Sequence, residues 1–335
     1  MTWTAIILCI VVLALVYIFF NYFKIKRMSE GTPDMVEMAG IIRSGANTFM
    51  KTEFRTIFLV VVIVAVIFSL FVERSSGISF LIGACMSSAG CVIGMKSATY
   101  ANVRTTNKAR ESLSIGETVK VALCGGSISG LGVQAFGMLG FIGVLLIWNG
   151  ISPDATGHGL LANLECNPSI MRITTYSLGC SIVAMFNRVA GGNYTKAADI
   201  SADILAKIRH DMPEDDSRVP NVNDIAGNCS DLLESFVATM AASVMIAVTI
   251  YNGTPGIGEG TLNATVIFPV ILAGVGLLGC LLGLGYASIR KMSDNPSKEL
   301  NLATWFSAGC TIVLGFVAAK IVFGGTELYE DFRFG

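Results

Sequence analysis

Residues Ile6–Phe23 read IILCIVVLALVYIFFNYF, an apolar run without one charged side chain. As an α-helix it is long enough to cross the hydrocarbon core of a bilayer, which takes roughly 17–25 residues. Lys24, Lys26 and Arg27 follow at once, where such a helix would leave the lipid. No basic segment precedes the run and no small-residue cleavage pattern ends it. We therefore interpret it as a retained signal anchor.

Seven further apolar runs of spanning length follow. They lie at Ile57–Val72, Phe80–Tyr100, Val121–Trp148, Ile173–Val189, Leu233–Tyr251, Val266–Tyr286 and Thr304–Phe323. Only 14% of the 335 residues are charged, whereas a soluble domain has about 25%. Because a backbone in lipid must satisfy its own hydrogen bonds, apolar spans fold as helices. The sequence predicts an all-α polytopic membrane protein of about eight transmembrane helices in one domain, residues 1–335.

Lys and Arg are concentrated in alternate connections between these runs. Of the 23 Lys and Arg residues, 18 lie in 24–56, 101–120, 188–224 and 290–300. The other connections, such as 149–171 and 252–265, are nearly free of them. The positive-inside rule then places the basic connections in the cytoplasm and the N-terminus outside, in a multi-pass protein of the cell membrane. A net charge of −1 without a basic stripe argues against a nucleic-acid partner.

Two shorter features predict local structure. Residues 34–56 resemble an interfacial amphipathic helix leading into the second span. Gly126 and Gly130 form a GxxxG pattern within the fourth run. Because glycine lets helix backbones approach closely in lipid, we expect this pair to pack against a neighbouring helix.

An ordered set of charges follows the fifth apolar run, where Tyr194–Lys207 reads YTKAADISADILAK. On a helix, four of its charged residues fall within an arc of about 80°: Lys196, Asp199, Asp203 and Lys207. A solvated face held by i,i+4 ion pairs would explain the pattern. A polyanion site would also explain it, because two aspartates one turn apart can hold Mg²⁺ and a nearby lysine can neutralise phosphate.

A second acidic pair begins the sixth apolar run. Asp231 and Glu234 are three residues apart and share a helix face. Carboxylates inside a membrane are costly unless they are paired or functional, which favours a role in ion movement. The alternative is an interfacial cap, in which the acids meet the positive end of the helix dipole.

The motifs around these residues resemble a known family. AMFNRVAGGNYTKAADISADILAKI, followed by MPEDDSR and then SDLLESF, is similar to the membrane-integral, ion-pumping inorganic pyrophosphatases. SGANTFMKTEFRTI and IGMKSATYANVRTTNKAR extend the similarity, which covers nearly the whole chain but roughly the N-terminal half of the family's usual length. The resemblance implies hydrolysis of cytoplasmic pyrophosphate bound with Mg²⁺, outward transport of Na⁺ or H⁺, and a homodimer. K⁺ would be a further cofactor in a potassium-dependent member.

The resemblance also implies roles for residues in segment 188–234. Lys196 would contact pyrophosphate, and the metal ligands would be Asp199, Asp203 and Glu214 of the PEDD motif. Asp224 would help to orient the attacking water as a catalytic residue. The ion gate would consist of Arg188, Asp231 and Glu234.

The sequence departs from the family in two ways that bear on catalysis. The stretch PEDDSRVPNVNDIAGNCSDLLESF retains Asp224 as the last aspartate of an acidic repeat, but two further aspartates of that repeat are missing. Losing two carboxylates from a multi-metal site should lower the rate by orders of magnitude. The family's C-terminal half, which supplies further residues to the same site, has no counterpart in the sequence.

Three hypotheses follow. The first is a pyrophosphate-energised cation pump of truncated or divergent sequence. The second is a catalytically inactive membrane subunit, or an anion-binding protein, that keeps the pyrophosphatase scaffold. The third is a secondary transporter in which the charge stripe conducts ions, but no pair of short, interrupted spans in matching halves favours it.

Overall fold

A computed structural model describes residues 2–148, 150–152, 155–161, 165–210, 225–253, 259–290 and 295–324. Within these residues the chain forms eight helices. They are α1 (Thr2–Arg27), α2 (Pro33–Phe71), α3 (Ser76–Ser112), α4 (Ile115–Ile147), α5 (Pro168–His210), α6 (Ile225–Gly253), α7 (Glu259–Ile289) and α8 (Pro296–Phe323). Each is long and apolar enough to cross a membrane. The predicted all-α polytopic architecture is confirmed.

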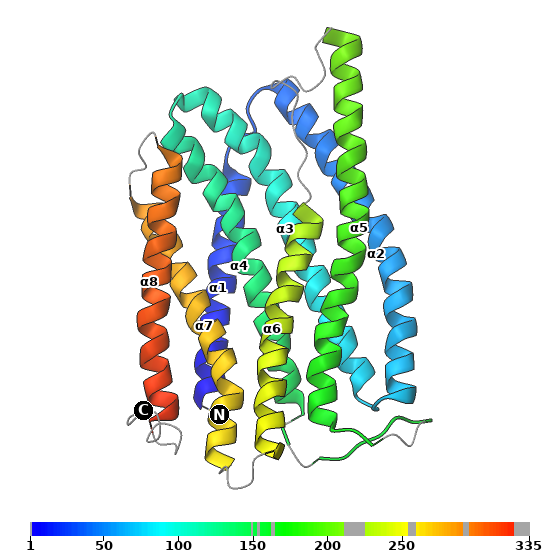
Figure 1. Cartoon of the computed structure of the whole chain (residues 1–335). Coiled ribbons are helices and arrows are strands. Elements are labelled where there is room, and N and C mark those ends of the chain that lie inside the picture. Colours follow the sequence, from blue (N-terminus) through cyan, green and yellow to red (C-terminus); the bar gives the residue numbers. More distant parts are fainter. Residues whose placement is uncertain are drawn as a thin grey trace.

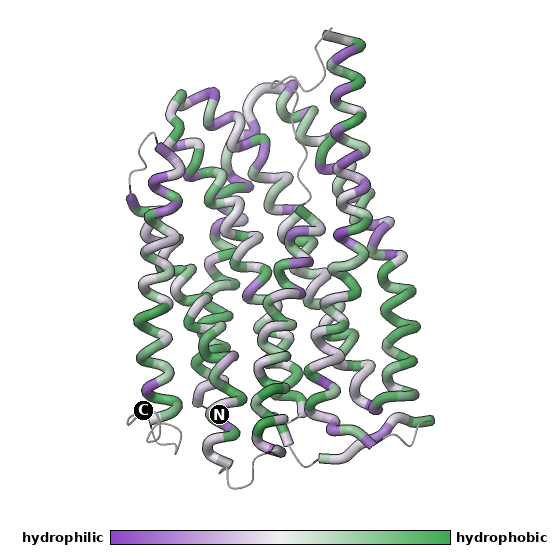
Figure 2. Tube along the Cα trace, in the orientation of Figure 1, coloured by the Kyte–Doolittle hydropathy of each residue, from purple (hydrophilic) through white to green (hydrophobic). Residues whose placement is uncertain are grey.

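The helices run alternately up and down, so the connections gather at two ends of the bundle (Figure 1). One end holds the C-termini of α1, α3, α5 and α7 and the N-termini of the helices that follow them. We call it the basic end, because the described parts of the four Lys- and Arg-rich connections lie there. Figure 2 shows the hydrophilic colouring concentrated at this end and apolar colouring through the middle of the helices.

Two helices extend the spanning runs toward the basic end. The segment predicted as an interfacial helix, 34–56, is the first half of α2 and continues into the apolar run without a break. Helix α5 has 43 residues and projects past the other helices (Figure 1). Because α-helices rise 1.5 Å per residue, this helix is roughly 65 Å long, about twice the roughly 30 Å thickness of the hydrocarbon core.

Helix α3 is central, in contact with α2, α4, α5 and α6. Its crossing with α5 is made by backbone: a Cβ added to Gly83 would overlap the Tyr176 carbonyl, and one added to Gly179 would overlap the Phe80 carbonyl. The fully buried Tyr176 donates its hydroxyl to the Gly137 carbonyl of α4 at 2.9 Å. Without a hydrophobic force between helices in lipid, such close contact and buried hydrogen bonding hold α5 in place.

The GxxxG prediction was wrong. No heavy atom of a neighbouring element lies within 4 Å of a Cβ built on Gly126 or Gly130. Close packing of α4 is made instead by Gly125, which meets Ala101 of α3, and by Gly137, which meets Phe236 of α6. The two GxxxG glycines face an open groove.

A buried arginine fixes the basic end. Arg104 of α3 donates to the carbonyls of Met28 at 3.1 Å and Lys26 at 3.2 Å, and pairs with Glu30 at 2.9 Å. Glu30 also accepts from Arg43 of α2 at 2.6 Å. Burial alone would raise the pKa of Glu30, but the hydrogen bond from Arg43 and the charge of Arg104 outweigh it and lower that pKa. The link between α1 and α2 is thus tied to α3.

Replacing Gly83 by alanine should destabilise the bundle by about 1–3 kcal/mol, because the added methyl group meets the Tyr176 carbonyl. Gly143→Ala on α4 is the matched control, since the space beside Gly143 is open. Alanine there should leave stability unchanged or raise it by up to about 1 kcal/mol. Thermal unfolding in detergent measures the difference. Equal melting temperatures for the two variants would contradict the backbone crossing of α3 and α5.

Candidate functional site

Helix α5 places two groups of candidate residues on one continuous rod. Arg188 pairs with Asp231 of α6. Lys196, Asp199 and Asp203 follow Arg188 along α5, toward the end of the helix that projects past the others (Figure 1). At 1.5 Å per residue, Lys196 is roughly 12 Å and Asp203 roughly 22 Å along the axis from Arg188. The two groups are therefore joined by one continuous helix.

The outer part of α5 is only partly covered. Lys196 is exposed, and Asp199 and Asp203 are partly buried. On one side Tyr194 contacts Phe49 of α2, with ring centroids 5.2 Å apart. Elsewhere along the segment, large apolar side chains are at least 48% exposed: Ile200, Ile204, Leu205 and Ile208. So much exposed apolar surface beside a charge stripe is typical of an interaction surface.

The predicted magnesium ligands are only partly within the described residues. Asp199 and Asp203 are one helical turn apart, which suits Mg²⁺, an ion that binds one or two carboxylates and keeps its other positions for water or phosphate. Glu214 and Asp224 lie outside the described residues. Among the residues that were described, no group of three or more His, Cys, Asp or Glu side chains is assembled.

The three residues predicted to form the ion gate lie together between α5 and α6. The Arg188 guanidinium pairs with the Asp231 carboxylate and lies 4.0 Å from the Glu234 carboxylate. The three side chains are 58%, 40% and 28% exposed, respectively, so one side of the cluster is open. Asp231 is the seventh residue of α6, and the first turn of that helix holds no acid. The dipole effect fades beyond the first turn, which argues against the interfacial-cap interpretation.

Buried contacts next to this cluster fix the relative positions of the two helices. Asn187 donates to the Ser230 hydroxyl at 2.6 Å, and both side chains are buried. On the far side, α6 is seated against α3, where Cys229 meets Gly94 and Leu233 meets Gly90. Sequence reasoning missed the Asn187–Ser230 bond. The sequence held one indication of this bond: Asn187 and Ser230 each stand immediately before a residue predicted to belong to the ion gate.

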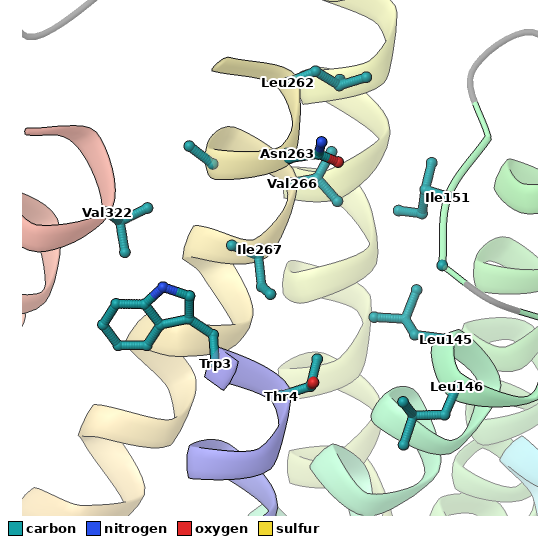
Figure 3. Close-up of a pocket in the computed structure, with 12 residues that line it drawn as sticks. Trp3, Thr4, Leu145, Leu146, Ile151, Leu262, Asn263, Val266, Ile267 and Val322 are labelled. Carbon is teal, nitrogen blue, oxygen red and sulfur yellow. The ribbon is translucent and has the colours of Figure 1, made fainter. Parts of the chain in front are cut away.

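A cavity of about 650 Å³ lies at the opposite end of the bundle, between α1, α4, α7 and α8. Figure 3 shows Trp3 of α1, Ile267 of α7 and Val322 of α8 around it. Its lining is mostly apolar, and none of the lining residues is charged. It offers no group that could neutralise a phosphate, so it is not a candidate for the anion site.

The family model for inorganic H⁺ pyrophosphatase matches residues 12–333. The chain belongs to this family. The resemblance inferred from the motifs around α5 is thereby confirmed, together with a membrane-integral location. The matched region includes the whole of α5 and α6, and thus both groups of candidate residues.

Relatives in the family differ in the transported ion. The chain is 39% identical over 317 residues to the K(+)-stimulated pyrophosphate-energized sodium pump of Thermotoga maritima, covering 88% of this chain and 43% of the relative. It is 30% identical over 342 residues to the K(+)-insensitive pyrophosphate-energized proton pump of Caldanaerobacter subterraneus subsp. tengcongensis, covering 94% of this chain and 45% of the relative. The chain therefore spans less than half the length of these relatives.

The Arg188–Asp231 ion pair predicts energetic coupling between α5 and α6. Arg188→Gln and Asp231→Asn should each destabilise the protein, and the double variant should cost less than their sum by roughly 0.2–1 kcal/mol, the range for exposed pairs. Arg188→Gln combined with Glu234→Gln is the matched control and should show weaker coupling, because that pair is 4.0 Å apart. Unfolding of the native protein, the three single variants and the two double variants in detergent measures both coupling energies. Additive costs for Arg188 and Asp231 would contradict the pairing.

Proposed function

We propose that the protein acts in a pyrophosphate-energised Na⁺ or H⁺ pump that hydrolyses magnesium pyrophosphate at the basic end, on the cytoplasmic side of the membrane. The observation that carries the proposal is the continuity of α5. One helix bears the Lys196–Asp203 stripe outside the bundle and the Arg188 ion pair inside it. Hydrolysis at one end can thus be coupled to an ion pair at the other.

In this proposal the stripe binds the substrate. The Lys196 ammonium neutralises pyrophosphate oxygens, while Asp199 and Asp203 hold Mg²⁺ with Glu214. Mg²⁺ would supply charge neutralisation of the phosphoryl oxygens and polarise the bond that is broken. Asp224 orients the attacking water. Segment 188–234 would then be the functional core of a single transmembrane domain.

Ion transfer would use the imbalance of charge between α5 and α6. Arg188 faces two carboxylates, so Asp231, Glu234 and Arg188 together have a formal charge of −1 when all are ionised. A Na⁺ ion or a proton can balance the remaining charge. If movement of α5 shifts Arg188 from one carboxylate toward the other, the cation loses its site and is released.

The uncovered sides of α5 and of the ion pair favour a partner. We propose that further protein covers them, either a second copy of the chain or a segment equivalent to the rest of the relatives' length. Lipid would surround the remaining bundle. A requirement for K⁺ would follow if this protein functions like its relative named as K(+)-stimulated.

An inactive membrane subunit that keeps the scaffold is the second candidate. The observation that favours it is the shortened acidic segment before Asp231, which lacks two aspartates of the family's repeat. In this case Lys196, Asp199 and Asp203 would bind magnesium pyrophosphate without hydrolysing it.

Hydrolysis by the purified full chain separates the two candidates. The pump proposal predicts Mg²⁺-dependent phosphate release that falls at least about 100-fold in Asp203→Asn, because one carboxylate of the metal site is lost. Glu117→Gln is the control, since Glu117 lies at the same end, paired with Lys108 at 3.6 Å. Equal rates for the native chain and Asp203→Asn would remove the catalytic role.

If the chain releases no phosphate, protection of Lys196 from amine labelling by magnesium pyrophosphate tests the binding role alone. Protection that is lost in Asp203→Asn would support the inactive subunit. Labelling that pyrophosphate does not change would contradict both candidates.

A further inference from the structure

A groove opens on the side of the bundle away from α5, between α4, α7 and α8. Its volume is about 420 Å³. Small and apolar residues form much of its lining, among them Gly126, Gly130, Gly283, Leu284, Ala303 and Thr304. The two α4 glycines have open space in place of side chains, and α8 is the least buried of the eight described spans. The groove therefore lies within the spanning part of the bundle and opens toward lipid.

The dimensions of the groove suit one hydrocarbon chain. Its α4 lining runs from Leu123 to Gln134, roughly 16 Å along the helix axis. This length is close to half of the roughly 30 Å hydrocarbon core, which is the distance that one acyl chain covers within a leaflet. An extended acyl chain can therefore lie along the groove.

Two of the hydroxyl groups in the groove lining are satisfied within the protein, whereas the buried Gln134 side-chain oxygen at its far end has no hydrogen-bond partner among the described residues. The Thr304 hydroxyl donates to the Leu300 carbonyl at 3.0 Å. Ser127 donates to the Cys124 carbonyl at 2.8 Å and accepts from Asn21 at 3.3 Å. Methyl and methylene groups therefore dominate the surface offered to an occupant.

At the basic end the groove adjoins a smaller pocket of about 50 Å³ between α1, α4 and α7. The two cavities share Leu123, Leu284 and Ala287 in their linings. Lys24, near the end of α1, and Lys120, near the start of α4, also line the smaller pocket. The ammonium groups of Lys24 and Lys120 thus lie at the end of the apolar groove that is nearer to the basic end.

Nearby acids are engaged elsewhere. Glu117, on the first turn of α4, pairs with Lys108 at 3.6 Å. Glu299, on the first turn of α8, pairs with Arg290 at 3.6 Å. Within the part of the chain that the structure describes, neither Lys24 nor Lys120 forms an ion pair, so their charge remains available to an anion.

We propose that this composite groove binds an anionic glycerophospholipid, with its phosphate between Lys24 and Lys120 and one acyl chain along Gly126 and Gly130. Basic pockets between helices at a cytoplasmic interface are suited to anionic headgroups, and apolar burial of the chain adds affinity. The site is separate from the pyrophosphate stripe and from the ion pair, and it does not rest on the proposed function.

Native mass spectrometry of the full chain in detergent tests whether Lys24 and Lys120 bind the lipid headgroup. Phosphatidylglycerol should be retained in preference to phosphatidylethanolamine of the same acyl chains. Lys24→Gln combined with Lys120→Gln should reduce its affinity roughly tenfold, because each lysine near an anionic headgroup contributes a severalfold factor. Lys26→Gln combined with Lys298→Gln is the charge-matched control at the same end, and it should change retention less than twofold. Equal losses in the two pairs, or equal retention of the two lipids, would overturn the proposal.

Filling the groove tests independently whether an acyl chain lies along Gly126 and Gly130. Gly126→Leu should fill the groove and lower phosphatidylglycerol retention, whereas Gly143→Leu on the same helix, outside the groove lining, should not. Both glycines face open space, so both variants should fold, which unfolding temperatures verify. An excess of glycerol phosphate should fail to displace the lipid. Displacement by glycerol phosphate, or unchanged lipid retention in Gly126→Leu, would show that the groove does not hold an acyl chain.

Discussion

The crossing of α5 over α3 is the contact on which the rest of the arrangement depends. Gly83 and Gly179 bring backbone against backbone, which leaves no flexible side chains between the helices to absorb movement. Packed interfaces of this kind change between discrete arrangements more readily than they deform. Helix α5 is therefore held against α3 in its first third, while its outer part reaches past the basic end and bears the charge stripe.

The ion pair between α5 and α6 depends on the packing of both helices against α3. Burying charge in a membrane is costly unless it is paired, and Arg188 pairs with Asp231 while Glu234 stays within 4.0 Å. The buried Asn187–Ser230 hydrogen bond and the contacts of Leu233 and Cys229 with α3 fix the helices that present these groups. One side of the cluster is exposed. The chain spans less than half the length of the relatives that it matches.

The apolar runs predicted the fold because lipid leaves the backbone few alternatives to a helix. The run at Ile57–Val72 defined the span of α2, although pattern alone did not show that residues 34–56 continue the same helix. Gly126 and Gly130 show what a local motif cannot predict. The GxxxG pattern identifies a helix face without side chains, but the positions of helices distant in sequence determine whether another helix packs against that face. The Arg188–Asp231 pair could be predicted from acidic spacing and family resemblance. The Asn187–Ser230 bond could not, because it depends on how α5 and α6 are rotated against each other.

We propose that pyrophosphate binding at the charge stripe of α5 is coupled through this helix to the carboxylates beside Arg188. Cation uptake into proteoliposomes, followed with radiolabelled Na⁺ and a pH-sensitive dye in parallel, is the decisive measurement. Uptake should start on addition of magnesium pyrophosphate, stop when pyrophosphate is exhausted, and be abolished by Glu234→Gln. Pyrophosphate hydrolysis without movement of either cation, or uptake that persists unchanged in Glu234→Gln, would contradict the coupling.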